Sequence, residues 1–415
     1  MATLSDPKPD SDLRARIVRV ALPFIARGGV RGATLREIAA DCGTTPASVL
    51  SIFGNKDGLI AACFDEAIRS DIARLEDLAA ECLKIGTAPG IVPAFLWTLC
   101  DEAGGARRTE MLTLIEMLLS AAVSPQIATP CRQWLLARRD ILRAIARAHA
   151  IDELAIDILG LHLISESSFA VSCAATASYA ILARSGFLEA AARLTDTDTG
   201  GIPPDMARLA DAFFADPESD RADSDEALGR GAESRAKIVD AAASIIEVEG
   251  LAAVTNRAVA DRAGVSLALT TYHFKSVADL AFAGILRVFE KVNAGLRRAG
   301  ARGASQDEAV GRIRSRAQLT GVERLRSRGM AEISLAAARG IAQPSLGLAM
   351  RRQRGTITHA SLGDTHGHVT RTRAASHALW SSGAFLVAAA LSDADALYDF
   401  ESQAAFASER LLGLR

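Results

Sequence analysis

The sequence has few aromatic residues, 5% of its 415 positions, and no unbroken apolar run long enough to cross a membrane. The longest apolar stretch, residues 169–183, is interrupted by Ser172, Thr176 and Ser178 and is shorter than the roughly 20 residues that a spanning helix needs. The N-terminus has no basic start followed by an apolar core, so we expect no secretion signal. These absences predict a cytoplasmic protein with no contact to a membrane.

Cysteine is present but shows no metal-binding or disulfide pattern. None of the residues forms a C-x-x-C pair or stands beside a histidine at ligand spacing, which predicts no metal site. Unpaired cysteines usually pack as small apolar side chains, and a redox-sensing role is the alternative. The six residues, all in the first half of the chain, are Cys42, Cys63, Cys82, Cys100, Cys131 and Cys173.

The motifs of common enzyme classes are also missing. The sequence contains no glycine-rich phosphate loop, no G-x-S-x-G turn and no H-E-x-x-H helix, which are the local signatures of nucleotide-binding, hydrolase and zinc protease sites. We therefore predict no enzyme activity and no cofactor. The formal net charge of −2 indicates neither a polyanionic nor a polycationic partner.

What the chain does have is an internal repeat. Residues 14–59 recur at 235–280 with 14 identities in 46 positions and no gap, among them Arg14 and Arg235, Gly43 and Gly264, and Phe53 and Phe274. A repeat of this length determines the architecture before local signals do. Residues 12–60 hold seven basic and four acidic residues, whereas residues 233–280 hold five and six, so the first copy is better suited to phosphate contacts.

Each copy reads as three helices with a tight turn. In the first copy, apolar residues 13–25 recur at helical spacing, although Pro23 should kink that helix, and Gly28-Gly29 end it. Thr34 is the expected cap of a second helix, with Glu37 completing a capping box, and Thr45 caps a third after the turn at Gly43. The second copy repeats this pattern with Thr255, Gly264 and Ser266, and Asn55 and Ser276 are expected caps of a fourth helix. Two short helices around a glycine turn, the second exposing hydroxyl groups, favour a DNA-binding helix-turn-helix.

The remaining segments are expected to be helical bodies joined by a linker. Residues 216–233 are acidic and nearly free of apolar side chains, which predicts a flexible connection long enough for the halves to lie side by side. Apolar helices are expected at about 153–183, 203–215, 374–391 and 395–413. The predicted domains are a disordered N-terminus (1–10), a first module (11–60), a first helical body (61–215), the linker (216–233), a second module (234–281) and a second body (282–415).

These residues resemble the TetR family of transcriptional regulators. The resemblance lies in Thr255-Asn256-Arg257, in 263–266 and in 271–280, and more weakly in Thr34-Leu35-Arg36, Gly43-Thr44-Thr45 and 53–59. It implies an all-α fold of two tandem TetR-like halves, each a three-helix helix-turn-helix DNA-binding module followed by a helical ligand-binding and dimerisation domain. The chain would then be a single-chain pseudo-dimer, with further pairing left open. The tyrosine usual three residues before the phenylalanine is Leu50 or Thr271 here, and the lysine that opens the fourth helix is kept as Lys56 but is Val277 in the second copy.

The resemblance also implies which residues meet double-stranded operator DNA. Contacts to phosphates fix the register without reading sequence, and those to base edges specify it; because the two modules differ, we predict unlike half-sites. The DNA-binding candidates are Thr34, Arg36, Thr44, Thr45, Pro46, Ser48, Ser51 and Lys56 in the first module, and Thr255, Asn256, Arg257, Ser266, Leu267, Leu269, Thr271, Tyr272, His273 and Lys275 in the second.

A small-molecule effector is expected in the first helical body, because apolar pockets with a few polar groups are typical of ligand sites. The second body is instead rich in arginine from Arg312 to Arg373, which we interpret as a solvated face, with an acidic ligand as the alternative. The predicted pocket residues are Phe95, Trp97, Trp134, His162, Phe169 and Tyr179.

The sequence thus predicts a sequence-specific DNA-binding regulator, a repressor released from an asymmetric operator by a small, mostly apolar ligand. Two alternatives stay open at this stage. One is a DNA-binding factor without an inducer, and the other is a helical protein-interaction scaffold whose modules no longer bind DNA, suggested by the lost lysine and the charge of the second copy.

Overall fold

The computed structural model of the chain describes residues 9–86, 90–122, 124–173, 176–197, 204–214, 230–301, 331–341, 344–362, 368–391 and 394–414, and these contain helices and no strand. The first half holds α1 (Pro9–Gly32), α2 (Leu35–Asp41), α3 (Pro46–Phe53), α4 (Lys56–Ile85), α5 (Ile91–Gly104), α6 (Arg108–Ala121), α7 (Pro125–Ala148), α8 (Glu153–Cys173), α9 (Ala177–Leu194) and α10 (Pro204–Phe214). The second half holds α11 (Arg230–Glu249), the short 3-10 helix η2 (Leu251–Ala253), α12 (Asn256–Ala263), α13 (Leu267–His273), α14 (Val277–Ala301), α17 (Pro344–Arg352), α18 (Thr356–Leu362), α19 (Arg371–Ala390), α20 (Ala394–Tyr398) and α21 (Phe400–Leu412).

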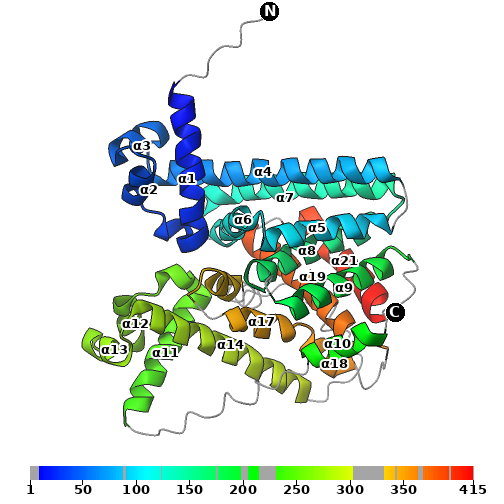
Figure 1. Cartoon of the computed structure of the whole chain (residues 1–415). Coiled ribbons are helices and arrows are strands. Elements are labelled where there is room, and N and C mark those ends of the chain that lie inside the picture. Colours follow the sequence, from blue (N-terminus) through cyan, green and yellow to red (C-terminus); the bar gives the residue numbers. More distant parts are fainter. Residues whose placement is uncertain are drawn as a thin grey trace, which may run out of the picture.

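The first half places a small module at one end of a helical body. Helices α1 to α3 pack on the start of α4, whose 30 residues run on into the body beside α7 (Figure 1). Pro23 lies inside α1, as predicted, and the backbone leaves the helical conformation at Gly29, where φ is +67°. A left-handed φ of this kind favours glycine. Gly250 adopts the same turn in the second copy, with φ of +87°.

The two halves are held together by a long apolar contact in the centre of the molecule. Helix α8 of the first half packs against α19 of the second, and α21 packs against both. Gly383 of α19 lies so close to α8 that a Cβ atom would overlap the carbonyl group of Leu161. Helix α8 is the one described helix apolar and long enough to cross a membrane, but 89% of its apolar window is buried inside the protein, as expected of a core helix.

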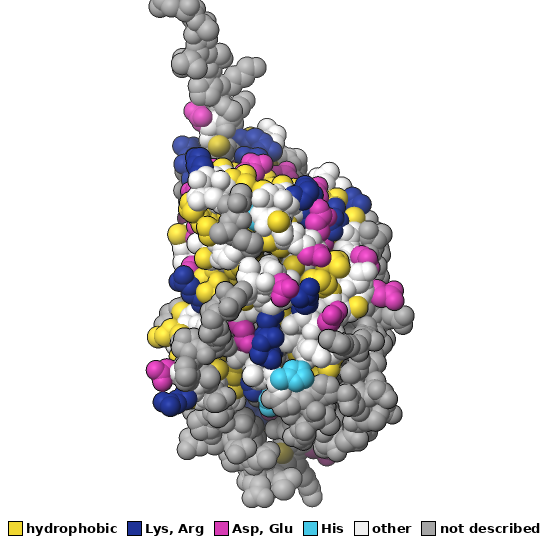
Figure 2. Space-filling view, turned by 90° about the vertical axis from the view of Figure 1, so that its right-hand side faces the viewer, with side chains coloured by type: hydrophobic (Ala, Val, Ile, Leu, Met, Phe, Trp, Pro, Cys, Tyr) yellow, Lys and Arg dark blue, Asp and Glu magenta, His cyan; other side chains and the backbone are white. Residues whose placement is uncertain are grey.

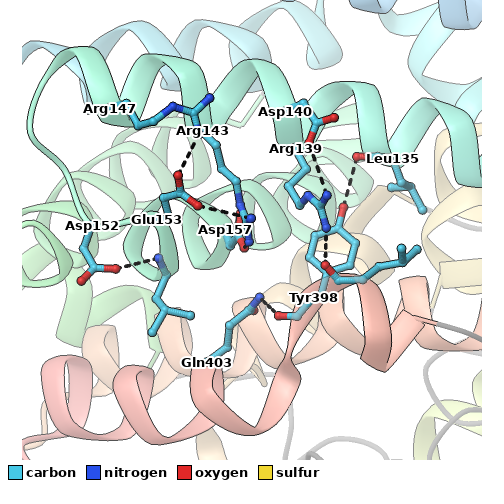
Figure 3. A network of polar contacts seen from close by, with 12 residues as sticks. Leu135, Arg139, Asp140, Arg143, Arg147, Asp152, Glu153, Asp157, Tyr398 and Gln403 are labelled. Carbon is cyan, nitrogen blue, oxygen red and sulfur yellow. Dashed lines mark hydrogen bonds and ion pairs between the residues drawn. The ribbon is translucent and has the colours of Figure 1, made fainter.

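Polar contacts extend the junction between the halves on one side (Figure 3). The Tyr398 hydroxyl, from α20, donates to the carbonyl oxygen of Leu135 in α7 at 3.3 Å, and Arg139 donates to the carbonyl oxygen of Leu397. Beside them, Arg143 of α7 makes a two-pronged contact with Asp157 of α8, at 3.0 and 2.6 Å. The C-terminal helices of the second half are thereby bonded to the body of the first.

The packing brings both repeated modules to one side of the molecule. In Figure 1, α3 and α13 both lie at the left-hand edge, the first above the second, with the joined bodies to their right. The opposite face, seen in Figure 2, intersperses acidic and basic side chains over most of its described surface. The modules therefore share one edge of the molecule, away from the mixed-charge face.

Several boundaries differ from the sequence prediction, and one of them is that the stretch predicted at about 395–413 forms two helices, α20 and α21. The apolar stretch 153–183 is not one helix, because α8 ends at Cys173 and α9 begins at Ala177. Helix α1 begins at Pro9, inside the segment predicted to be disordered, and α11 begins at Arg230, inside the predicted linker. The start of α1 at Pro9 suits the preference of proline for the first turn of a helix, where its missing N–H costs no helical bond. The rest of the predicted linker, residues 216–229, and residues 1–8 lie outside the described residues.

Candidate nucleic-acid interface

The first module has the predicted helix-turn-helix geometry. The Thr34 hydroxyl caps α2 by accepting the backbone N–H of Glu37 at 3.3 Å, and Thr45 caps α3 by accepting that of Ser48 at 3.2 Å. Between the helices Gly43 adopts a φ of +62°, a conformation that side chains disfavour. Pro46 stands in the first turn of α3, where its missing N–H costs no helical bond. The predicted caps Thr34 and Thr45 and the turn at Gly43 are confirmed, and the Glu37 carboxylate accepts from the Thr34 hydroxyl.

The second module repeats these contacts with different residues. Thr255 accepts the N–H of Ala258 at 3.1 Å, Ser266 accepts that of Leu269 at 3.2 Å, and Gly264 forms the turn with φ of +67°. The predicted fourth-helix caps are confirmed too, because Asn55 accepts from Gly58 at 2.8 Å and Ser276 accepts from Asp279 at 3.1 Å. Position by position, the repeat in the sequence is a repeat in three dimensions.

Most predicted base-reading side chains are accessible. In α13 the Tyr272 ring is 80% exposed and Leu267 is 51% exposed, and Thr271 is exposed although its hydroxyl donates back to the carbonyl groups of its own helix. In α3, Pro46 and Ser51 are exposed and Ser48 is half-buried. Exposed apolar groups on such a helix suit the methyl groups of thymine in a major groove.

Some candidates face inward instead. Leu269 is half-buried and packs against the core, so it is not placed to read base edges. Thr44, Asn256 and His273 are also half-buried, and the His273 ring lies against that of Tyr272, with centroids 5.3 Å apart. The sequence alone could not separate Leu269 from Leu267, since a seven-residue helix has too few apolar positions to define its inner face.

The basic candidates divide in the same way. Within the described residues, the side chains of Arg36, Arg257 and Lys275 are exposed and make no hydrogen bond or ion pair, which leaves them free for phosphates. Lys56 is half-buried, and its ammonium group donates to the carbonyl oxygen of Arg31 at 3.2 Å. It therefore ties the end of α1 to the start of α4.

The sequence reasoning missed two features of the interface. Leu50 is 40% exposed on α3, at the position that Thr271 occupies in the repeat. Arg14 lies over the Phe53 ring at 4.9 Å, and Arg235 lies over Phe274 at 5.3 Å, so each copy places a guanidinium group at the C-terminal end of its recognition helix. Both arginines belong to the identities between the copies, and that shared pairing with phenylalanine was the available signal.

The predicted pocket residues are all in the first body but do not enclose one cavity. Trp97 and His162 pack on Phe187, with ring centroids 5.5 and 5.3 Å away. Trp134 makes a different contact, since its indole N–H donates to Asp71 at 2.7 Å. Phe95 is half-buried, and the buried Phe169 ring lies under Arg354, 5.2 Å from the guanidinium carbon.

His162 and Tyr179 instead converge on Glu166, which the sequence reasoning did not single out. The Tyr179 hydroxyl donates to Glu166 Oε1 at 3.0 Å, and His162 Nε2 lies 3.7 Å from Glu166 Oε2. Burial acts to raise the pKa of Glu166, but the charge of Arg351 and its hydrogen bonds outweigh burial and lower the pKa to about 2. Burial lowers the pKa of His162, so this imidazole is neutral near pH 7.

The arginine-rich segment of the second half is not a solvated face where it is described, and that interpretation was wrong. Arg351 is 5% exposed and paired with Glu166 across the two halves. Arg339 also reaches the first half, where it contacts Glu116 at 2.7 Å. Residues 312–330 lie outside the described residues. Composition showed the arginines but not the carboxylates opposite them, because those come from a distant part of the chain.

The cysteines are packed and unreactive. All six are buried and free, and burial raises the pKa of Cys63 and that of Cys131 to about 12. A thiol with so high a pKa stays protonated near neutrality and is a poor nucleophile, which argues against redox sensing at these two positions. Within the described residues, no three histidine, cysteine or acidic side chains are grouped to hold a metal ion.

Comparison with known proteins agrees with the geometry of the two modules. The family model described as bacterial regulatory proteins, tetR family, matches residues 17–63 and matches again at residues 238–283. The first match runs from within α1 to the start of α4, and the second runs from within α11 to the start of α14. A search of the curated proteins finds no significant match to the chain.

Proposed function

Because the chain belongs to the tetR family of bacterial regulatory proteins and is a DNA-binding transcriptional regulator with two tandem halves, we propose that it acts as a repressor on an operator with two unlike half-sites. The observation that carries the proposal is the arrangement of the modules. Both recognition helices lie at one edge of the joined bodies (Figure 1), as binding to successive major grooves about 34 Å apart requires.

In this proposal the two halves of one chain correspond to the two subunits of a dimer. A homodimer has two identical recognition helices and reads a palindrome. Here α3 offers Pro46, Leu50 and Ser51, whereas α13 offers Leu267, Thr271 and Tyr272 at the same repeat positions. Fusion of the halves frees the two helices to differ, and the half-sites differ accordingly.

Release follows from the packing of the halves. A ligand shifts a two-state equilibrium only by its preference for one state, so an effector bound in the body must favour a spacing of α3 and α13 that does not fit the duplex. The contact of α1 with α6 links the first module directly to the body in which the effector would bind.

The experiment is a gel shift with the chain's own promoter region at two salt concentrations. Arg36→Gln and Arg257→Gln should each weaken binding on any sequence and reduce the slope of log affinity against log salt by about one. Arg410→Gln is the matched control, since Arg410 of α21 is a half-buried basic residue that pairs with Asp196, and it should leave the slope unchanged. Equal slopes for wild type and both module variants would contradict DNA binding through these helices.

A second candidate is a DNA-binding factor that has no inducer. It is favoured by the small size of the cavity between the halves, whose free volume is about 10 Å³, close to the space of one water molecule. Operator affinity that stays constant across ligands shown by calorimetry to bind the protein would favour this candidate over the ligand-released repressor.

A further inference from the structure

The junction between the halves contains a buried ion pair with one unused donor. Arg351 of α17 donates from Nε to Glu166 Oε1 at 2.9 Å and from Nη2 to Glu166 Oε2 at 3.0 Å. Glu166 is fully buried and Arg351 is 5% exposed. The remaining nitrogen, Arg351 Nη1, is buried and has no hydrogen-bond partner among the described residues. A charged donor without an acceptor in the interior destabilises the folded state. We therefore expect a hydrogen-bond acceptor at Arg351 Nη1.

Positive charge exceeds negative charge around that donor. Arg354 donates to the Ser382 hydroxyl at 2.9 Å, and Arg371 donates to the carbonyl oxygen of Arg352 at 2.9 Å, but neither guanidinium group pairs with a carboxylate among the described residues. Burial, together with the nearby charge of Arg351, lowers the pKa of Arg354 and that of Arg371 to about 10. Three guanidinium groups, those of Arg351, Arg354 and Arg371, thus lie near one another, whereas Glu166 pairs with Arg351 alone, and an added anion would relieve the repulsion between them.

A pocket lies beside Arg351 with otherwise mainly apolar walls. Tyr179 and Leu182 of α9, Phe213 and Phe214 of α10, Arg351 of α17 and Ala375 of α19 line it, so both halves contribute. We call it the inter-half pocket. Its apolar walls are one element of a small-molecule site, and a single charged group that fixes orientation is the other.

We propose that the inter-half pocket binds a small monocarboxylate with an apolar body, its carboxylate accepting from Arg351 Nη1 and its apolar end lying against Phe213 and Phe214. This deepens the proposed function and rests on it only for the regulatory consequence. One free guanidinium nitrogen between apolar walls suits a single carboxylate, since a doubly charged phosphate would leave acceptors unsatisfied.

The free volume of about 10 Å³ means that such a ligand enters only if a wall moves. Helix α10 is one of these walls, and it packs on α9 and α19. Two arginines contact its rings: Arg352 lies over Phe213 at 5.1 Å and Arg371 over Phe214 at 4.7 Å. An outward shift of α10 breaks these cation–π contacts and part of the core packing of the buried Phe213, so the ligand's contacts with both rings must replace them.

Calorimetric titration of the full chain with octanoate tests the proposal. Octanoate should bind, whereas octan-1-ol and inorganic phosphate should bind at least tenfold more weakly. Octan-1-ol lacks the carboxylate that pairs with Arg351, and phosphate lacks the apolar chain that lies against Phe213 and Phe214. Glu166→Gln removes the carboxylate that repels the ligand and competes for Arg351, so octanoate affinity should rise roughly tenfold. The double variant Glu166→Gln with Arg351→Met should lose octanoate binding. General structural damage would lower affinity in both variants.

Phe214→Trp provides a variant that leaves the buried ion pair intact. It fills the apolar end of the pocket and should weaken octanoate binding about tenfold or more. Equal binding of octanoate and octan-1-ol, or octanoate binding that survives loss of Arg351, would overturn the proposal.

A parallel gel shift separates the pocket from the proposed function. Wild-type protein that binds the operator but not octanoate overturns the pocket alone. Protein that binds octanoate in the predicted variant order, without any change in operator affinity, supports the pocket and contradicts ligand release.

Discussion

Arg339 of the second half and Glu116 of the first half form an ion pair, Nη2 to Oε2 at 2.7 Å, at the point where the first DNA-binding module meets the body. The other oxygen of Glu116 accepts the backbone N–H of Val30 at 3.0 Å, and Arg339 Nε donates to the carbonyl oxygen of Ala26 at 2.8 Å. The last turn of α1 is therefore held by residues from both halves.

Arg339→Gln should loosen the first module. Glu116 would keep its charge but lose its partner, and breaking a largely buried pair costs about 3 kcal/mol. Urea unfolding should show that loss, and hydrogen exchange should speed up at the Val30 amide. The double variant with Glu116→Gln should regain most of the stability. Arg410→Gln, which breaks an exposed pair, is the control and should change stability by less than about 1 kcal/mol. Unchanged exchange at Val30 in Arg339→Gln would contradict the coupling.

Gly383→Ala should disrupt the contact between the halves. The new methyl group would overlap the backbone carbonyl of Leu161, and a backbone atom cannot rotate away as a side chain can. Overpacking of this kind typically costs about 1 to 3 kcal/mol, occasionally more, and thermal unfolding measures it. Gly28→Ala is the matched control, because no atom lies within 4 Å of the added methyl group. A stability equal to that of Gly28→Ala would refute the close packing of α8 on α19.

Acid should weaken the junction through Glu166. The pKa of Glu166 is lowered from 4.5 to about 2 in the folded chain. Its contribution to the free energy of unfolding is therefore complete above pH 4.5 and is lost as the pH falls towards 2. The shift corresponds to about 3 kcal/mol. The free energy of unfolding, measured from pH 6 to 2.5, should fall more steeply for wild type than for the double variant Glu166→Gln with Arg351→Met. Glu66→Gln, at an exposed pair with Arg69, should keep the wild-type slope; identical slopes for wild type and the double variant would argue against a charged Glu166.

Tyr272→Ala should change what the second module reads without changing its charge contacts. The ring is 80% exposed on α13, and loss of a base contact typically costs about 1 to 3 kcal/mol at that position. Binding to a library of half-sites should become less selective while the salt slope stays the same. Lys275→Gln is the contrasting variant, with a lower slope and unaltered selectivity. A lower slope for Tyr272→Ala would assign its hydroxyl to a phosphate instead.

The modules were predicted in detail because their signals are local. Thr34 and Ser266 cap helices three residues ahead, and Gly43 and Gly264 allow a turn that other residues resist. Such interactions involve neighbours in the chain, so the sequence alone predicts them, and the repeat at an offset of 221 predicts them in both modules. Within the modules the prediction did not foresee contacts that depend on packing: Leu269 is half-buried where α13 meets the neighbouring helices, and Lys56 donates to the carbonyl oxygen of Arg31.

The sequence by itself determined an all-α chain with two helix-turn-helix modules, since helical spacing, caps and turn glycines act over a few residues. Only the tertiary structure decided which arginines are buried and what they face. Arg351 meets Glu166 across 185 residues, and Arg339 meets Glu116 across 223. Such pairings depend on how α8 and α19 bring the halves together, because an ion pair forms wherever packing places two charges and leaves no periodic trace in the sequence.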